Sequence, residues 1–346
     1  MADTSSIGPQ WPPRETSHGR VKGIDNRGIV RDRERLANLL GVLERFASQA
    51  GAAGSRDRGP DRISIRALVA DGLIEDERAA LEPFGEAIVP LESGGELEGC
   101  SLLYLGWNGS DRRSAGEDVE RALANIATAV ERHRRRPAEI RERVERQGFA
   151  LSIPSMEERR SEARLGEDVA ALYRRFGWSA GDTRQILEHE DSLIAVAREG
   201  EGEEARVVSA GIAELSKIEL GDGASLRIAE FTEAATLKTH QGRGLYSAIC
   251  ATLMLELAHR SRRGETFGGE IDVAFGESSG HDLGVLIAAI RLGRTFSRQV
   301  VGERRLPFPG YLPQHVPIAG APRSTRYNDL FPTFLSRRAL YEFAQS

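Results

Sequence analysis

The sequence predicts a mixed α/β protein, and three observations indicate this fold class. Short apolar runs of strand length alternate with longer segments whose apolar residues recur at helical spacing. The clearest helical pattern runs from Leu245 to Leu257, where every fourth residue is leucine or isoleucine. The chain has 346 residues, of which 40% are hydrophobic and 29% charged, and this length and composition are typical of a soluble protein with two folded units.

The first unit is expected at residues 31–155, after a loose arm over residues 1–30 that is rich in Pro, Gly, Arg and Ser. It should be a small α/β domain, and its sequence contains no residue pattern that we can assign to chemistry. The expected elements are a helix over about 31–50, strands at 63–69, 86–91 and 100–107, a helix at 116–134, and a helix from 137 to about 148.

The second unit is expected at residues 156–302, where the alternation of strands and helices sharpens. It should carry a mixed sheet, and residues 303–346 should form an irregular excursion with a final strand and helix. The expected elements are helices at 156–176 and 182–189, strands at 192–198, 205–215 and 224–237, a helix at 245–260, a strand at 270–276, a helix at 281–293 and a strand near 296–302.

Charge and composition argue against several classes of protein. The net charge of −5 is unlike that of a nucleic-acid-binding protein, and no apolar run reaches the ~18 residues of a membrane span. Cys100 and Cys250 have no metal-ligand or redox spacing, so no metal site is predicted. The N-terminus lacks the apolar core of a secretory signal, and we expect a location in the reducing cytoplasm. The sequence leaves open whether the chain forms a homodimer.

The segment with the strongest chemical signal is the loop between the strand at 224–237 and the helix that begins at Leu245. A turn of this kind directs unpaired backbone N–H groups and the positive end of the helix dipole at one point, which suits a diphosphate. Gly242 and Gly244 would let phosphates approach the backbone closely. The loop is neither a Walker A loop nor a dinucleotide-binding fingerprint. By itself, this pattern is weak evidence and favours an ordinary turn over a phosphate site.

The wider segment resembles a known family. Residues 229–237 (AEFTEAATL), followed by Gln241-Gly242-Arg243-Gly244-Leu245, resemble motif A of the GNAT N-acetyltransferases, whose loop reads Q/R-x-x-G-x-G/A. The motif is most similar to that of β-lysine N-acetyltransferase-like proteins. Two departures stand out: Tyr246 occupies a position where the family prefers Gly or Ala, and Lys238-Thr239-His240 replaces the usual lead-in that contains proline.

The resemblance implies direct transfer of an acyl group from acetyl-CoA to an amine. The pyrophosphate would lie on the N–H groups of residues 242–246, and the pantetheine arm would run beside a strand that parts from its neighbour. This assigns cofactor binding to Ala235, Thr236, Leu237, Gln241, Gly242, Arg243, Gly244, Leu245 and Tyr246.

Catalytic groups are expected on the same strand. An amine attacks only when neutral, so a general base is needed, and Glu233 or Glu230 could supply it. Because the two lie three residues apart, they should face opposite sides of the strand, and only one should point toward the acyl group. A tyrosine often protonates the leaving thiolate in this superfamily, and Tyr327 is the candidate here, although no tyrosine has the usual spacing after the strand at 270–276.

The acceptor is expected to be a small amino-acid-like amine, and Arg304 and Arg305 in the excursion could bind its carboxylate. An excursion that simply wraps the first unit is the competing interpretation. Two further alternatives stay open. The strand at 100–107 and the helix at 116–134 echo the order of the second unit, so the first could be a degenerate GNAT half. The whole chain could also be a degenerate, non-catalytic GNAT that binds CoA or a partner protein.

Overall fold

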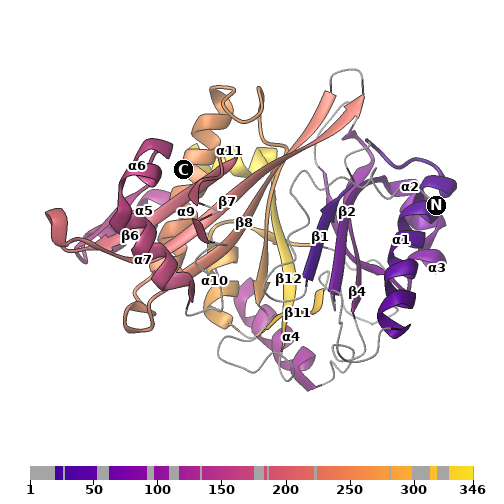
Figure 1. The fold of residues 1–346 in the computed structure, drawn as a ribbon, viewed down its shortest axis with the longest axis horizontal. Helices are drawn as coiled ribbons and strands as arrows, with labels where there is room; N and C mark the ends of the chain where they lie inside the picture. The colour runs from indigo at the N-terminus through magenta and orange to yellow at the C-terminus, as the bar shows by residue number, and fades with distance from the viewer. Residues whose placement is uncertain are drawn as a thin grey trace.

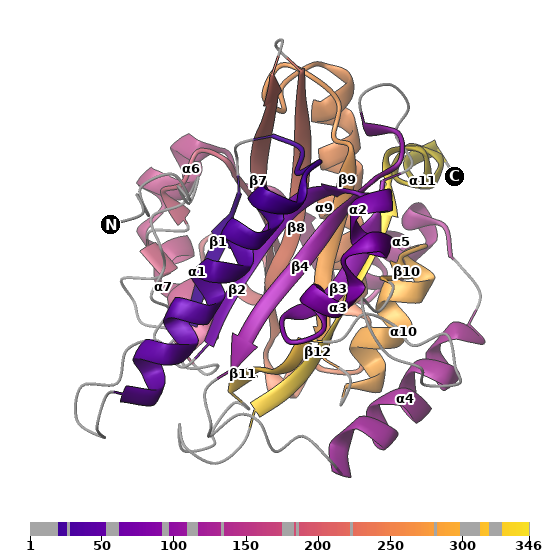
Figure 2. The same cartoon turned by 90° about the vertical axis from the view of Figure 1, so that its right-hand side faces the viewer.

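The computed structural model describes twelve segments: residues 20–25, 28–52, 62–91, 97–108, 117–132, 135–174, 183–184, 187–221, 224–279, 282–297, 312–317 and 327–345. They form a mixed α/β structure with two sheets that face each other, which confirms the predicted fold class. In Figure 2, helices α1, α2 and α3 lie in front of the first sheet, and the second sheet lies behind it. No helix in the described part of the chain is long and apolar enough to cross a bilayer.

The first sheet has four strands in the order β1-β2-β4-β3. Its elements are β1 (Arg20–Ile24), α1 (Arg33–Ala52), β2 (Arg62–Ala70), α2 (Asp71–Asp76), α3 (Arg78–Leu81), β3 (Gly85–Pro90) and β4 (Cys100–Asn108). β1 pairs with β2 in parallel, with α1 between them in sequence. β1 lies within the segment expected to be a loose arm. Its pairing depends on β2, which is about forty residues away in the chain, so the local composition carried no signal for it.

The second sheet has eight strands, seven of them in the order β10-β12-β9-β8-β7-β6-β5, with β11 paired to β12. Its elements up to β10 are α4 (Glu117–Val130), α5 (Pro137–Glu145), β5 (Phe149–Ser152), α6 (Met156–Ser161), α7 (Ala163–Arg174), β6 (Ser192–Glu199), β7 (Arg206–Gly221), β8 (Ala224–Thr236), α9 (Leu245–Arg262), β9 (Val273–Ser279), α10 (Leu283–Arg291) and β10 (Thr295–Phe296), with short 3₁₀ turns at Gly202–Glu204 and Lys238–His240.

The expected boundary near residue 155 does not coincide with the division between the two sheets. β5 pairs with β6, and α5 packs into the core beneath α9 through Ile140 and Val144. Helix α4 packs against α10 through Ala122, Ile126 and Leu286. The two helices expected in the first unit at 116–134 and 137–148, together with β5, therefore belong to the second unit by packing. The order strand, helix, strand, helix, strand from β8 to β10 matches the expectation.

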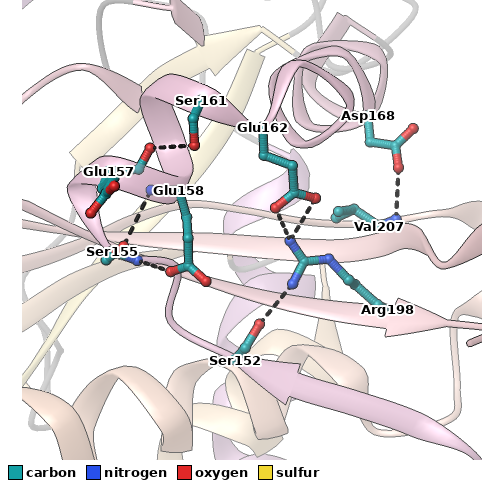
Figure 3. Close-up of polar contacts among 9 residues, drawn as sticks. All are labelled: Ser152, Ser155, Glu157, Glu158, Ser161, Glu162, Asp168, Arg198 and Val207. Carbon is teal, nitrogen blue, oxygen red and sulfur yellow. Dashed lines mark hydrogen bonds and ion pairs between the residues drawn. The ribbon is translucent and has the colours of Figure 1, made fainter. Parts of the chain in front are cut away.

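The segment expected to form one helix at 156–176 contains two, α6 and α7, which are separated at Glu162. Figure 3 shows the polar contacts that hold these two helices in place. Ser155 and Glu158 form a reciprocal cap at the start of α6. Glu162 accepts two hydrogen bonds from Arg198 at 3.1 and 3.2 Å, and Asp168 accepts one from the backbone N–H of Val207 at 3.0 Å. These contacts fasten both helices to β6 and β7.

The C-terminal segment supplies β11 (Leu312–Pro317), β12 (Tyr327–Ser336) and α11 (Arg337–Gln345). β12 pairs antiparallel with β9 from Leu330 opposite Ser279 to Ser336 opposite Val273. α11 packs against α9 through Leu340 and Phe343, which are fully buried. The final strand and helix were predicted, whereas the insertion of the strand between β9 and β10 was not.

The second sheet has two differently covered faces, which we name by what packs on them. The helix face carries Ala229, Phe231 and Ala274 in one core with α9. The sheet face carries Ile228 and Phe275, among others, and packs against Leu68, Leu102 and Tyr104 of the first sheet. Alternation along β8 and β9 places every second residue on the same face.

Candidate active site

The candidate site begins where β8 and β9 cease to pair. The two strands run in parallel from Ile228 opposite Val273 to Phe231 opposite Gly276, and their pairing ends there. β8 continues to Thr236 beside β7, and β9 continues to Ser279 beside β12. We call the rung formed by Phe231 and Gly276 the parting point. Beyond it, the edge of β8 that faces β9 has no strand partner among the described residues.

A β-bulge lies just beyond the parting point. The register of β7 and β8 passes from Ile212 opposite Thr232 to Ala210 opposite Ala235, so Gly211 faces both Glu233 and Ala234. A Cβ atom at position 211 would lie 2.6 Å from the Cγ2 atom of Ile249. The glycine therefore allows α9 to approach the bulge closely, and any larger residue would force the helix away from the strand.

The loop that follows β8 leads directly into α9. Gly242 and Gly244 both have left-handed backbone conformations, with φ of +79° and +88°. Gly244 is the N-cap of α9, and no side chain caps the helix. The first N–H groups of α9 are therefore left for another acceptor, and they carry the positive end of the helix dipole.

Residues at the end of α5 and the start of β5 contact this loop. The side chain of Gln147 donates to the carbonyl of Arg243 at 3.3 Å. The guanidinium of Arg243 lies 5.6 Å from the ring centre of Phe149 and 3.7 Å from a carboxylate oxygen of Glu199. His240 contacts the same carboxylate at 3.0 Å through Nε2. The loop is thus built from residues 147–149 and 199 as well as from its own sequence, and its position is fixed by tertiary contacts.

The predicted cofactor residues follow a continuous path from the bulge to the helix. Ala235 is buried, and its carbonyl accepts from Ser209 at 3.0 Å, while the hydroxyl of Thr236 lies 2.8 Å from that of Ser209. The N–H of Leu237 donates to Val208 at 2.9 Å. Gln241, Gly242 and Arg243 are exposed, Leu245 is buried, and Gly244 and Tyr246 are half-buried.

Tyr246 extends from the first turn of α9 into the protein interior. It packs against the core of the helix face, and its hydroxyl lies beside the thiol of Cys250 one turn along the helix. Burial raises the pKa of both groups above their ordinary values. Both are therefore neutral at physiological pH, and the bulky residue that departs from the family pattern is accommodated between α9 and its neighbours.

Glu230 lies on the sheet face in a buried ion pair with Arg66 of β2, at 2.7 Å between Nη2 and Oε2. Both residues are 6% exposed. Burial opposes the charge on Arg66 and is the largest single influence, but Glu230, Tyr104 and Glu277 together outweigh it, and the pKa of Arg66 is raised. The guanidinium also lies over the ring of Phe275 at 5.0 Å and beside Tyr104, whose pKa burial raises well above its usual range.

Two residues at the parting point were not predicted as site residues from the sequence. Glu277, immediately after Gly276, is half-buried on the sheet face and close enough to Arg66 to raise the pKa of that guanidinium. Arg294, on the helix face, is 4% exposed, and its guanidinium lies 4.5 Å from the ring centre of Phe231. Neither belongs to a recognisable motif, because each is brought here by the topology of the sheet.

Several predicted residues cannot be placed. Arg304 and Arg305 lie outside the described residues. Glu233 and Tyr327 are described by their backbones only, within β8 and at the start of β12. Among the described residues, no cluster of His, Cys, Asp and Glu could hold a metal ion.

No protein-family model matches this sequence, and no curated protein matches it. Solved structures of acetyltransferases are similar to about half of the chain. The NAA60 protein of Arabidopsis thaliana with a bisubstrate analogue is 8% identical over 54% of this chain and 97% of its own, with a TM-score of 0.38. The ribosomal-protein-S18-alanine N-acetyltransferase of Escherichia coli is 13% identical over 54% of this chain and 93% of its own, with a TM-score of 0.36.

Proposed function

We propose that the chain is an acyl-CoA-dependent N-acyltransferase that moves an acetyl group to the amine of a small amino-acid-like metabolite. One observation carries the proposal: β8 parts from β9 and then leads, through two left-handed glycines, into a helix whose N-terminus has no side-chain cap. An unpaired strand edge and an anion-binding helix end lie in one continuous segment. This combination suits a cofactor with a diphosphate at one end and a peptide-like arm.

The diphosphate would bind at residues 242–246. Backbone N–H groups at the start of α9 would donate to its oxygens, and the helix dipole would favour its charge. Arg243 is exposed, and its contact with Glu199 at 3.7 Å is long, so its guanidinium could turn toward a phosphate. The arm would run along residues 232–237, where backbone groups of β8 face no neighbouring strand.

The reaction we propose is direct attack of a neutral amine on the thioester carbonyl. Backbone N–H groups of β8 beyond Phe231 would donate to the carbonyl oxygen and stabilise the oxyanion that forms. The base could be Glu233, at the bulge, or Glu277, which is half-buried on the sheet face. Glu230 is less suited to this role, because its carboxylate is buried on the sheet face and held by Arg66 at 2.7 Å.

Cofactor binding is tested by thermal protection with CoA. Gly244→Val should abolish the protection, since a β-branched residue resists a φ of +88° and would block the approach of a phosphate. Gly264→Val is the matched control. Gly264 follows the other end of the same helix at a φ of +71° with no atom near its missing Cβ, so it carries similar backbone strain without touching the loop. Equal CoA affinity in both variants would contradict the loop assignment.

Catalysis is tested by release of free CoA thiol from acetyl-CoA with a panel of amines. Glu277→Gln and Glu233→Gln each keep the shape of the side chain and remove its charge. The variant that lacks the true base should lose kcat at neutral pH while CoA binding stays normal. If both retain kcat, the base is neither residue. Arg304, Arg305 and Tyr327 stay predictions for acceptor binding and for the acid, and alanine or phenylalanine at each position tests them in the same assay.

A non-catalytic module that binds CoA or a partner protein is the second candidate. Two observations favour it: Tyr246 fills a position where the related family is small, and Glu230 is engaged by Arg66. CoA binding without thiol release from any amine would support this candidate over the enzyme.

A further inference from the structure

Arg294 occupies an unusual position beside the parting point. It follows α10, where the N–H of Gly293 bonds to Ile290 at 2.9 Å and that of Arg294 to Ala289 at 3.0 Å. This turn ends the helix and directs the side chain back toward the sheet. A Cβ atom on Gly276 would lie 2.6 Å from Nη1 of Arg294 and 3.0 Å from the carbonyl oxygen of Phe231. The guanidinium therefore sits against the last paired rung of β8 and β9, and only a glycine at 276 leaves room for it.

This guanidinium is buried, and the described residues give it no counter-charge. Its Nε and Nη2 atoms are inaccessible to solvent and have no hydrogen-bond acceptor, and the described residues offer it no carboxylate within ion-pair distance. Among the described residues, the titratable groups that interact with it are Tyr246 and Cys250 of α9, and both are neutral. Asp282, which also acts on Tyr246, accepts from the N–H of Val285 at 3.1 Å. A buried cation with unused donors is costly, so its retention indicates an anion that arrives from outside.

The proposed function identifies which anion can reach this point. Residues 232–236 separate the parting point from the end of β8, and five strand residues span ~16 Å at the usual rise. An extended pantetheine arm that starts at the phosphate loop is of similar length. Its sulfur would therefore lie next to Phe231 and Gly276, on the strand edge beside Arg294.

We infer that Arg294 stabilises the leaving thiolate of CoA, and this inference rests on the proposed acyltransferase function. The amine nitrogen bonds to the carbonyl carbon, and the C–S bond breaks with its electron pair on sulfur. The proton of the amine goes to the base, and water later protonates the thiolate. Arg294 transfers no proton; its N–H groups donate charge-assisted hydrogen bonds to sulfur. The residue thus supplies electrostatically what a tyrosine acid would supply by proton transfer.

The arrangement suits catalysis because the cation stays unpaired until the thiolate forms. A donor that is already in place for the charge of the transition state needs no reorganisation during the reaction. Arg66 cannot serve this purpose, since Glu230 already neutralises it on the opposite face.

The test compares CoA with desulfo-CoA, which lacks the sulfur, in wild type, Arg294→Met and Arg294→Lys. Methionine fills a similar volume and removes a buried, unpaired charge, so it should fold at least as well as wild type. In wild type, the ultraviolet absorbance of the thiolate should show that the pKa of the bound thiol is about one unit or more below that of free CoA. CoA should therefore bind about tenfold more tightly at a pH above the free thiol pKa than at a pH below the bound one, whereas desulfo-CoA should show no such gain. Arg294→Met should remove this shift of the thiol pKa, and Arg294→Lys should keep part of it.

Kinetics supply the second measurement. Arg294→Met should lower kcat with acetyl-CoA by about 100-fold, and KM for acetyl-CoA should change far less. An unshifted thiol pKa in wild type would overturn the inference, and so would an equal loss of CoA and desulfo-CoA binding in the Met variant. Wild type could also prefer succinyl-CoA to acetyl-CoA and lose this preference in Arg294→Met. That result would overturn the inference, because Arg294 would then bind a carboxylate of the acyl group. If wild type binds neither nucleotide, the proposed function itself fails.

Discussion

Arg66 and Arg294 lie on opposite faces of the same pair of strands, and they differ in one respect: Arg66 has a partner. Arg66 meets Glu230 at 2.7 Å between the two sheets, whereas Arg294 lies over Phe231 with two nitrogens that have no acceptor among the described residues. Each lies near a tyrosine whose pKa is raised: Tyr104, which is buried, or Tyr246, which is half-buried. Burial of an arginine therefore does not by itself reveal its role. The presence or absence of a counter-charge separates a residue that holds the fold from one that awaits a ligand.

The largest effect is expected on the paired face. Glu230→Gln removes the charge that balances a buried guanidinium, and breaking such a pair should destabilise the protein by about 3–5 kcal/mol. The free energy of unfolding in urea measures this loss. Glu277→Gln is the control, because Glu277 is more exposed and contributes less to the raised pKa of Arg66. If both variants lose the same stability, the 2.7 Å pair is not the dominant contact.

The unpaired face should respond in the opposite direction. Arg294→Met removes a buried cation that has no partner, so the apoprotein should gain about 1–3 kcal/mol in the same urea experiment. Arg66→Met provides the contrast, since it leaves the Glu230 carboxylate buried without its cation and should destabilise. A loss of stability in Arg294→Met would mean that the guanidinium already has a stabilising partner in the apoprotein.

The two tyrosines predict how stability changes with alkali. Their folded-state pKa values lie above the ordinary value of 10.0, because burial favours the neutral form. As the pH rises, the unfolded chain releases these protons before the folded protein does. The contribution of the two tyrosines to the free energy of unfolding is therefore complete below about pH 10 and falls as the pH rises further. Each tyrosine should contribute a slope of about 1.4 kcal/mol per pH unit in that range. Tyr104→Phe and Tyr246→Phe should each flatten the decline, and an unchanged slope in either variant would contradict the burial of that hydroxyl.

The smallest effect is expected where an ion pair is open to solvent. Glu162 accepts two hydrogen bonds from Arg198, but 42% of its side chain is exposed. Water and salt screen such a pair, so Glu162→Gln should cost only about 0.2–1 kcal/mol. The cost should shrink further in high salt, whereas that of Glu230→Gln should persist. Equal salt dependence for the two variants would remove the distinction between exposed and buried pairs.

Most of the local structure could be predicted from the sequence. The helix that begins at Leu245 and the glycine turn before it follow from apolar spacing and from the need for a left-handed backbone, and both signals lie within a few residues of the feature they determine. β1 and β5 were not predicted. Each is short, and each exists because of a partner strand, β2 or β6, that lies elsewhere in the chain.

The candidate site divides in the same way. The sequence alone determined the segment from Glu230 to Tyr246, because the carboxylates, the glycines and the helix start are contiguous. It could not determine that Glu230 meets Arg66, which is 164 positions away, or that Arg294 reaches Phe231 with no carboxylate of the described residues beside it. Only the tertiary structure decided these contacts, because the charge state and role of a buried group depend on what the fold packs against it, and residue type alone carries no record of that partner.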